Sequence, residues 1–204
     1  MPALIAIVYY SMYGHVARLA ASVKQGARSV NGVSTTVYQV AETLSPDVLN
    51  CLGAAPKPDH PIATPDTLKN RDGVLFGLPT RFGMVPAQMK ALFDQCGGLW
   101  KSGALVDKPA GLFFSTNTPG GGQETTAMAT TPFLAHLGML LVPLGYRTSL
   151  LSNMDELHGG SAWGAGTLAG VDSQRRPTAL ELEIARLQDQ AFAQVACRLQ
   201  AKRG

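Results

Sequence analysis

Three short segments rich in glycine and hydroxyl side chains have the residue types of a site that binds an anion. They are residues 11–16 (S-M-Y-G-H-V), 79–83 (P-T-R-F-G) and 115–122 (S-T-N-T-P-G-G-G). In the first segment, Ser11 and Gly14 stand directly before a helical pattern, and the free N–H groups of a helix N-terminus bind phosphate. The segment matches neither G-x-G-x-x-G nor a Walker A motif, so it indicates neither a dinucleotide nor a nucleoside triphosphate.

The other two segments add groups suited to a flat ligand that carries negative charge. Thr80 is a hydrogen-bond donor for a ring carbonyl or nitrogen, Arg81 is always charged and suits an anion, and Phe82 suits the side of a ring. The run 115–122 offers consecutive backbone N–H groups that form an anion nest. Each segment alone also fits a plain structural role, as a capped strand–helix turn, a turn with a surface arginine, or a flexible loop.

The elements around these segments alternate between short apolar runs and helical periodicity. Residues 4–10 are apolar and β-branched, as in a parallel strand covered on both faces. Thr178 and Glu181 have the spacing of a capping box. Further strands are predicted at 34–40, 73–77, 109–115 and 139–142, helices at 15–29, 87–95, 123–137 and from Thr178 to about 199, a long ordered loop with one helical turn at 41–70, and an irregular segment at 149–178. The pair Gly97-Gly98 is predicted to end the helix at 87–95.

Five strands separated by helices predict an α/β fold with a doubly wound parallel sheet, in one domain over residues 1–204. Ligands of such sheets bind outside the carboxyl ends of the strands. The three polar segments each follow a predicted strand, so they converge on one edge of the sheet. This convergence predicts a cofactor pocket at that edge.

Charge and cysteine content exclude several classes of protein. A net charge of +3 and a pI near 8.8 do not favour a nucleic-acid partner. The apolar run at 3–10 is too short for a membrane span or a signal peptide. Cys51, Cys96 and Cys197 form neither a disulfide framework nor a metal-binding pattern, and free thiols fit a reducing compartment. We therefore expect a cytoplasmic protein without a bound metal.

The low content of charged residues, 15%, indicates surface that is buried against other subunits. Trp163 and Leu168 would be costly to expose, so we expect them to be buried between subunits or against the core. Arg198, Lys202 and Arg203 are interpreted as the solvated end of the last helix, where cations complement the helix dipole.

Several motifs spread over nearly the whole chain form a joint pattern. They are Y-Y-S-M-Y-G-H at 9–15, F-G-L-P-T-R-F-G at 76–83, L-F-D-Q-C-G-G-L-W at 92–100, G-G-G-Q-E-T-T at 120–126, L-A-H-L-G-M at 134–139 and G-G-S-A-W-G-A-G-T-L-A-G at 159–170. Together they resemble the WrbA family of flavodoxin-like NAD(P)H:quinone oxidoreductases.

The resemblance implies a flavodoxin-like sheet of order 2-1-3-4-5, non-covalent FMN and a homotetramer. It implies two-electron reduction of quinones by NAD(P)H, in a ping-pong reaction that passes a hydride through flavin N5. The first segment would surround the phosphate, the second would contact the isoalloxazine, and the third would contact the ribityl chain and the ring edges. The implied cofactor-binding residues are Ser11, Met12, Tyr13, Gly14, His15, Val16, Pro79, Thr80, Arg81, Phe82, Gly83, Ser115, Thr116, Asn117, Thr118, Pro119, Gly120, Gly121 and His136.

The resemblance also assigns substrate contacts. Tyr13 would border the nicotinamide, and Trp100, supplied across a subunit contact, would border the quinone. His136 is the predicted catalytic residue, which would hydrogen-bond or protonate a quinone oxygen. From the residues alone, His136 and Trp100 fit structural roles equally well. The chain departs from the family pattern at Asn117, at Pro119 and at residues 84–86.

Two other functions are open at this point. One is a non-enzymatic flavodoxin-type electron carrier, which the basic pI and the long segments 41–70 and 149–178 disfavour. The other is a regulatory interaction protein, for which the sequence contains no partner-binding motif.

Overall fold

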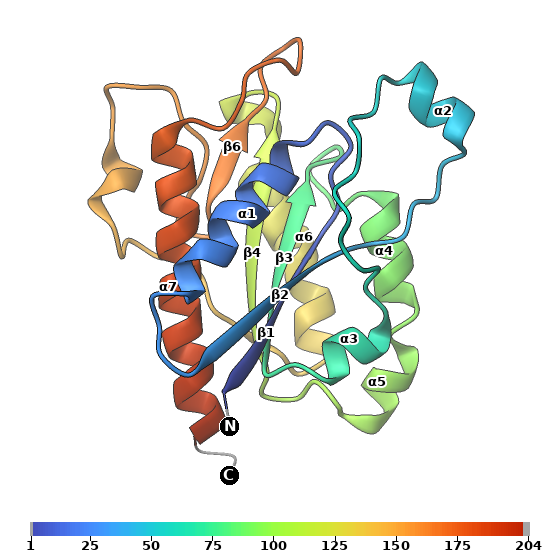
Figure 1. Ribbon diagram of the computed structural model, residues 1–204, viewed down its shortest axis with the longest axis vertical. Helices are drawn as coiled ribbons and strands as arrows, with labels where there is room; N and C mark the ends of the chain where they lie inside the picture. Colours follow the sequence, from blue (N-terminus) through green and yellow to red (C-terminus); the bar gives the residue numbers. More distant parts are fainter. Residues whose placement is uncertain (1, 202–204) are drawn as a thin grey trace.

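A parallel β-sheet with helices on both faces organises the chain (Figure 1). The computed structural model describes residues 2–201. The strands are β1 (Ala3–Tyr9), β2 (Val33–Gln39), β3 (Gly73–Pro79), β4 (Pro109–Thr116), β5 (Leu140–Leu141) and β6 (Gly166–Leu168). The helices are α1 (His15–Ala27), α2 (Pro46–Cys51), α3 (Pro65–Lys69), α4 (Ala87–Asp94), α5 (Gly97–Ser102), α6 (Gln123–His136) and α7 (Ala179–Ala201), with 3-10 turns η1 (Pro119–Gly121) and η2 (Ser149–Ser152). The strand order β2-β1-β3-β4-β5 confirms the predicted flavodoxin-like sheet.

Side chains of the central strand β1 alternate between two hydrophobic clusters, one on each face of the sheet. Ile5 and Ile7 join the cluster beneath α1 and α7, whereas Ala6 and Val8 join the cluster on the opposite face. All four are fully buried. Because both faces of a parallel sheet are covered by helices, the whole run has to be apolar, as the sequence shows.

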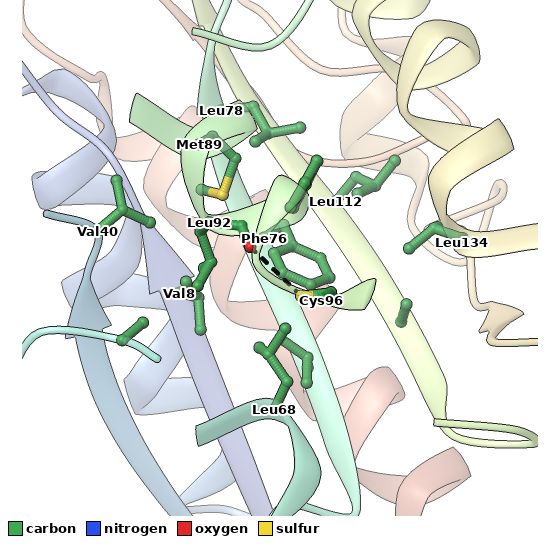
Figure 2. Close-up of a cluster of buried hydrophobic side chains, with 14 of the residues drawn as sticks. Val8, Val40, Leu68, Phe76, Leu78, Met89, Leu92, Cys96, Leu112 and Leu134 are labelled. Carbon is green, nitrogen blue, oxygen red and sulfur yellow. Dashed lines mark hydrogen bonds between the residues drawn. The ribbon is translucent and has the colours of Figure 1, made fainter. Parts of the chain in front are cut away.

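On the face away from α1 and α7, Phe76 of β3 stands at the centre of a cluster that also holds side chains of α3, α4 and α6 (Figure 2). Cys96 lies in this cluster, and its thiol donates to the carbonyl of Leu92 at 3.3 Å. Burial raises the pKa of Cys96 to about 11, so this thiol is unreactive. Cys51 and Cys197 are also free thiols.

On the opposite face, helices α1 and α7 are in close contact. A Cβ atom at Gly26 of α1 would lie 2.0 Å from the carbonyl oxygen of Arg186 in α7, so only glycine fits there. Beneath the helices, a Cβ at Gly111 of β4 would lie 2.5 Å from Leu75 Cδ2. Small residues therefore let this helix pair lie close to the sheet, which fixes the N-terminus of α1 relative to the strand ends.

Two short strands share the sheet position next to β4. β5 pairs with the first two residues of β4, and β6 pairs with its end, where Ser115 is opposite Thr167. The predicted strand at 139–142 is therefore confirmed, but it is only two residues long. The prediction that 149–178 is irregular was wrong for β6 and η2. A three-residue strand that contains a glycine is too short to show period-two alternation.

The helix predicted at 87–95 is confirmed by α4, but the sequence analysis missed the short helix α5, which begins at Gly97. One further prediction about local structure was wrong. Residues 41–70 contain two short helices rather than one turn, and each follows a side-chain cap, at Ser45 and at Thr64. Each of these helices has proline in its first turn, the position where proline is tolerated.

Trp163 and Leu168, which the sequence analysis expected to be buried, pack against other parts of the same chain. Leu168 is buried, and Trp163 is partly buried against the cluster around Phe76. These contacts support the core alternative for this pair. Arg198 is exposed near the end of α7, as expected, and Lys202 and Arg203 lie outside the described residues. Among residues 2–201, the structure has no helix with the length and apolar character needed to cross a bilayer.

Candidate cofactor site

The carboxyl ends of the strands surround one cavity of about 770 Å³, at the end of the sheet to which the arrows of β3 and β6 point (Figure 1). The loops after β1, β2, β3, β4 and β6 all contribute to its wall. Of the residues predicted to bind a cofactor, those that line it are Ser11, Met12, Tyr13, His15, Val16, Pro79, Thr80, Arg81, Phe82, Ser115, Thr116, Asn117 and Gly121. The three polar segments thus meet in one place, where doubly wound sheets bind ligands.

The loop after β1 presents an unsatisfied hydroxyl at a helix N-terminus. Gly14 is the N-cap of α1 with φ of 87°, a conformation that favours glycine, and no side chain caps the helix. The Ser11 hydroxyl oxygen is buried and has no hydrogen-bond partner among the described residues. A buried polar atom without a partner is costly unless a ligand satisfies it. The loop therefore fits the phosphate of a bound cofactor.

A hydrogen bond to a distant part of the chain fixes the side chain of His15, the first residue of α1. Its Nε2 lies 2.8 Å from the carbonyl oxygen of Arg175, which is far away in the sequence. Burial lowers the pKa of His15, so the neutral ring is favoured and Nε2–H donates this bond. This bond connects the wall of the cavity to the segment that precedes α7.

The loop after β3 forms a tight turn at the rim of the cavity. Arg81 and Met84 exchange backbone hydrogen bonds around Phe82 and Gly83, whose φ values are 52° and 75°. A positive φ is strained for phenylalanine, and the Phe82 side chain is fully exposed. The hydroxyl of Thr80 lies 3.0 Å from that of Thr126 in α6. The turn thus presents an exposed aromatic ring, a guanidinium and an oriented hydroxyl.

The loop after β4 divides into two parts. Ser115, Thr116 and Asn117 line the cavity, together with Gly121. The Thr116 hydroxyl donates to the carbonyl of Thr118 at 2.9 Å, and the chain then enters the turn η1. Three members of the predicted set lie away from the cavity wall as a result. Pro119 and Gly120 line a separate cavity of about 360 Å³, and neither cavity is lined by Thr118.

The loop after β2 and the start of α4 contribute residues that the sequence analysis did not identify. Leu44 and Gln88 line the cavity, and Glu42 connects them from behind. The Glu42 carboxylate accepts from the backbone N–H of Leu44 at 3.2 Å and from Gln88 Nε2 at 2.9 Å. Burial alone would raise the pKa of Glu42, but hydrogen bonds, first of all from Lys57, lower it to about 2. The further lining residues that the sequence analysis missed are Leu52, Pro86, Ala87, Ala169 and Ser173.

One signal in the sequence points to two of these missed residues. Ala87 and Gln88 open the helix that follows the second polar segment, as His15 and Val16 open the helix after the first. A rule that includes the first turn of each following helix would have found them. Ala169 and Ser173 gave no such signal, because they depend on the pairing of β6 with β4.

Trp100 and His136 do not line the cavity, and both are exposed. His136 is the last residue of α6, and α6 begins beside the cavity at Gln123 and runs away from it. A helix of this length carries its last residue roughly 20 Å from its first. Trp100 lies in α5, which Figure 1 shows near the opposite end of the sheet. Within one chain, neither side chain reaches the cavity.

Comparisons with known proteins agree with this geometry. Residues 11–149 match the family described as NADPH-dependent FMN reductase. The chain is 54% identical to NAD(P)H quinone oxidoreductase PST3 of Candida albicans, over 92% of this chain and 95% of the relative. It is also 54% identical to protoplast secreted protein 2 of Saccharomyces cerevisiae, over 95% of this chain and 98% of the relative.

A solved structure supports the fold. The flavodoxin, WrbA-like protein from Agrobacterium tumefaciens matches with a TM-score of 0.67 and 24% identity, over 96% of this chain and 98% of that chain. The resemblance to flavodoxin-like quinone oxidoreductases that the motifs indicated is confirmed by these findings together.

Proposed function

We propose a function from one premise: the chain belongs to the NADPH-dependent FMN reductase family. The chain is an oxidoreductase that reduces quinones with NAD(P)H, the reaction that the name of its Candida albicans relative describes. It does so through a bound FMN, the flavin that the family description names. One observation supports the cofactor in particular. The cavity at the strand ends contains a buried Ser11 hydroxyl, which has no hydrogen-bond partner among residues 2–201 and lies beside the N-terminus of α1.

FMN fits the chemistry of this cavity along its whole length. The phosphate would lie at Ser11 and the first turn of α1, where an unsatisfied hydroxyl and backbone N–H groups suit an anion. The ribityl chain and ring edges would lie against the loop from Ser115 to Asn117. The isoalloxazine would lie at the turn that contains Thr80 and Arg81. Non-covalent binding is proposed because no cysteine lines the cavity among the described residues.

The residues of the ring end have distinct tasks. Bound FMN supplies a ring that accepts a hydride from NAD(P)H and delivers it to a quinone. Tyr13 and the exposed Phe82 offer flat surfaces to the nicotinamide and to the quinone in turn, which fits a ping-pong reaction. Arg81 supplies a positive charge beside the isoalloxazine ring. Thr80 donates a hydrogen bond to the ring and so fixes the orientation of the ring in the cavity.

A second copy of the chain completes the site in this proposal. Trp100 is 62% exposed and lies outside the cavity of its own chain, as does His136. We propose that a homotetramer places Trp100, and His136 as quinone proton donor, at the cavity of a neighbouring copy. Sedimentation of a clean monomer at micromolar protein concentration would contradict this assembly.

The other functions are tested by the same preparation. An electron carrier would bind FMN without oxidising NAD(P)H, and an interaction protein would bind its partner equally well without FMN.

The cytoplasmic compartment is proposed from the free cysteines alone. The name of the yeast relative refers to secretion from protoplasts, so fractionation of producing cells is the measurement that decides the compartment.

The decisive experiment begins with the visible spectrum of the purified protein. We expect a yellow protein that releases its flavin on denaturation and that oxidises NADH or NADPH when benzoquinone is added. A colourless protein that cannot be reconstituted with FMN would overturn the cofactor. FMN-loaded protein without steady-state turnover would leave the electron carrier as the function.

A further inference from the structure

A fully buried carboxylate lies outside the cavity and has no role in the proposed reaction. Glu181, in the first turn of α7, is 0% exposed. The sequence predicts it only as the acidic member of a capping box, and both capping-box bonds to Thr178 are present, at 2.9 and 3.3 Å. A capping box requires no burial, because it satisfies only two backbone N–H groups. The burial of Glu181 therefore needs another explanation.

The carboxylate of Glu181 accepts hydrogen bonds from several separate positions between residues 159 and 178. Its oxygens accept from backbone N–H groups, a hydroxyl and a guanidinium. The donors are Gly159 N at 2.9 Å, Leu168 N at 3.2 Å, Thr167 Oγ1 at 2.8 Å, Thr178 N at 2.9 Å and Arg175 Nη1 at 3.0 Å from both oxygens. A carboxylate offers about four lone-pair positions, so this one is saturated with donors. Its partners extend from before β6 to the start of α7.

Arg175 extends this network. Its guanidinium also donates to the carbonyls of Leu168 at 2.6 Å and Leu157 at 2.8 Å. Its backbone N–H donates to the carbonyl of Ala169 at 2.9 Å. Glu181 and Arg175 together therefore fix the path of the chain between β6 and α7.

The segment fixed in this way reaches the cavity at the end that would hold the phosphate. Ala169 and Ser173 line the same cavity as the loop after β1. The carbonyl of Arg175 accepts the hydrogen bond from His15 Nε2, at the first residue of α1. The carboxylate thus acts on the N-terminus of α1 through one intermediate residue.

We infer that Glu181 is a positioning residue for the phosphate end of the cofactor: through Arg175, it holds His15 and the segment from Ala169 to Ser173 in the geometry that binds the phosphate. This inference rests on the proposed function. It predicts that the loss of Glu181 weakens the binding of FMN and leaves the binding of riboflavin, which lacks the phosphate, unchanged.

The test compares both flavins on cofactor-free protein by quenching of flavin fluorescence. In Glu181→Gln, an amide NH₂ faces groups that are themselves donors, so the network cannot close. We expect the Kd for FMN to rise about tenfold, as for the loss of a charge-assisted contact. The Kd for riboflavin should stay at the wild-type value. Glu183→Gln is the matched control, because Glu183 lies on the same helix and its carboxylate pairs with Arg186 at the surface, away from the Glu181 network.

A second variant covers the case in which Glu181→Gln does not fold. Arg175→Lys keeps the charge but cannot reach the carboxylate and two carbonyls together, since lysine lacks the planar fork of arginine. It should raise the Kd for FMN less strongly, again without an effect on riboflavin. Equal rises for both flavins, or no rise for FMN, would overturn the positioning role. Failure of the wild-type protein to bind FMN would instead overturn the proposed function on which this role rests.

Discussion

A buried acid between α1 and α7 makes the stability of this protein depend on pH in an unusual direction. Asp189 of α7 is fully buried, and its Oδ2 accepts a hydrogen bond from the backbone N–H of Ala27 at 2.9 Å. Its other oxygen has no partner among the described residues. Burial raises the pKa of Asp189 from 3.8 to about 7, although the bond from Ala27 lowers it in part.

The sign of the effect follows from proton binding. Between about pH 4 and pH 7, Asp189 is protonated in the folded protein and ionised in the unfolded chain. The folded state then binds more protons, so the free energy of unfolding falls as pH rises through this range. The slope is at most about 1.4 kcal/mol per pH unit, and the whole range corresponds to roughly 4 kcal/mol. Above the folded pKa the loss is complete and the contribution becomes flat.

Asp189→Asn removes the titration and keeps an oxygen that accepts from Ala27. Urea unfolding of cofactor-free wild-type and variant protein between pH 4.5 and 8.5 measures the effect. We expect the variant to gain stability relative to wild type as pH rises to about 7, and the gain to level off above it. The difference between the two proteins is the test, because His15 contributes an opposite slope to both. Asp94→Asn, which removes an exposed carboxylate that pairs with Lys90 at the surface, measures the effect of net charge together with the small effect of one surface ion pair. Parallel curves for wild type and Asp189→Asn would refute the reasoning.

Three further predictions address the cavity and the helix contact. Ser11→Ala should not lower the stability of cofactor-free protein, because the Ser11 hydroxyl has no partner among the described residues, and should raise the Kd for FMN at least about tenfold in a titration; an unchanged Kd would remove Ser11 from the phosphate site. Glu42→Gln should lower the free energy of unfolding by about 2 kcal/mol at pH 7 after allowance for solvent screening. Most of this loss should disappear as pH falls from 4.5 to 2, because the wild-type carboxylate is increasingly protonated in that range. A loss that persists in full at pH 2 would contradict the assignment to ionisation. Gly26→Ala should cost about 3 kcal/mol in urea unfolding because its Cβ would overlap the Arg186 carbonyl. Gly97→Ala should be nearly neutral, because among the described residues no atom beyond its own helical backbone and chain neighbours lies within 4 Å of the added Cβ.

Local sequence determined the strands β1 to β5 and the approximate positions of the three polar loops, but not β6. The run that became β1 is apolar at every position because both faces of a parallel strand are covered, and this is visible without any tertiary information. The capping-box pattern at Thr178 and Glu181 also located the start of α7, because a helix cap depends only on residues that are close in the sequence. The convergence of the three polar segments at one edge of the sheet followed from the topology of doubly wound sheets.

Tertiary structure alone decided which distant residues complete the cavity. Leu44 and Gln88 meet at its wall because Glu42 accepts hydrogen bonds from both, across a separation that no local pattern encodes. Ala169 is present because the short strand β6 pairs with the end of β4. The positions of Trp100 and His136 were likewise invisible in the sequence, since they depend on the direction in which α5 and α6 leave the sheet. Whether another copy brings them to a cavity stays a prediction.

The two buried acids of α7, Glu181 and Asp189, show which structural features cannot be predicted from the sequence alone. Glu181 and Asp189 lie two turns apart on one helix, and sequence spacing places both on the same face. The fold surrounds Glu181 with donors from Gly159, Thr167, Leu168, Arg175 and Thr178. In contrast, one oxygen of Asp189 has no hydrogen-bond partner within the described part of the chain. Periodicity determines that a side chain faces inward, because it depends on the geometry of one helix. What the side chain meets there depends on which other segments the fold brings to that point, and this decides whether a buried carboxylate organises a site or makes stability depend on pH.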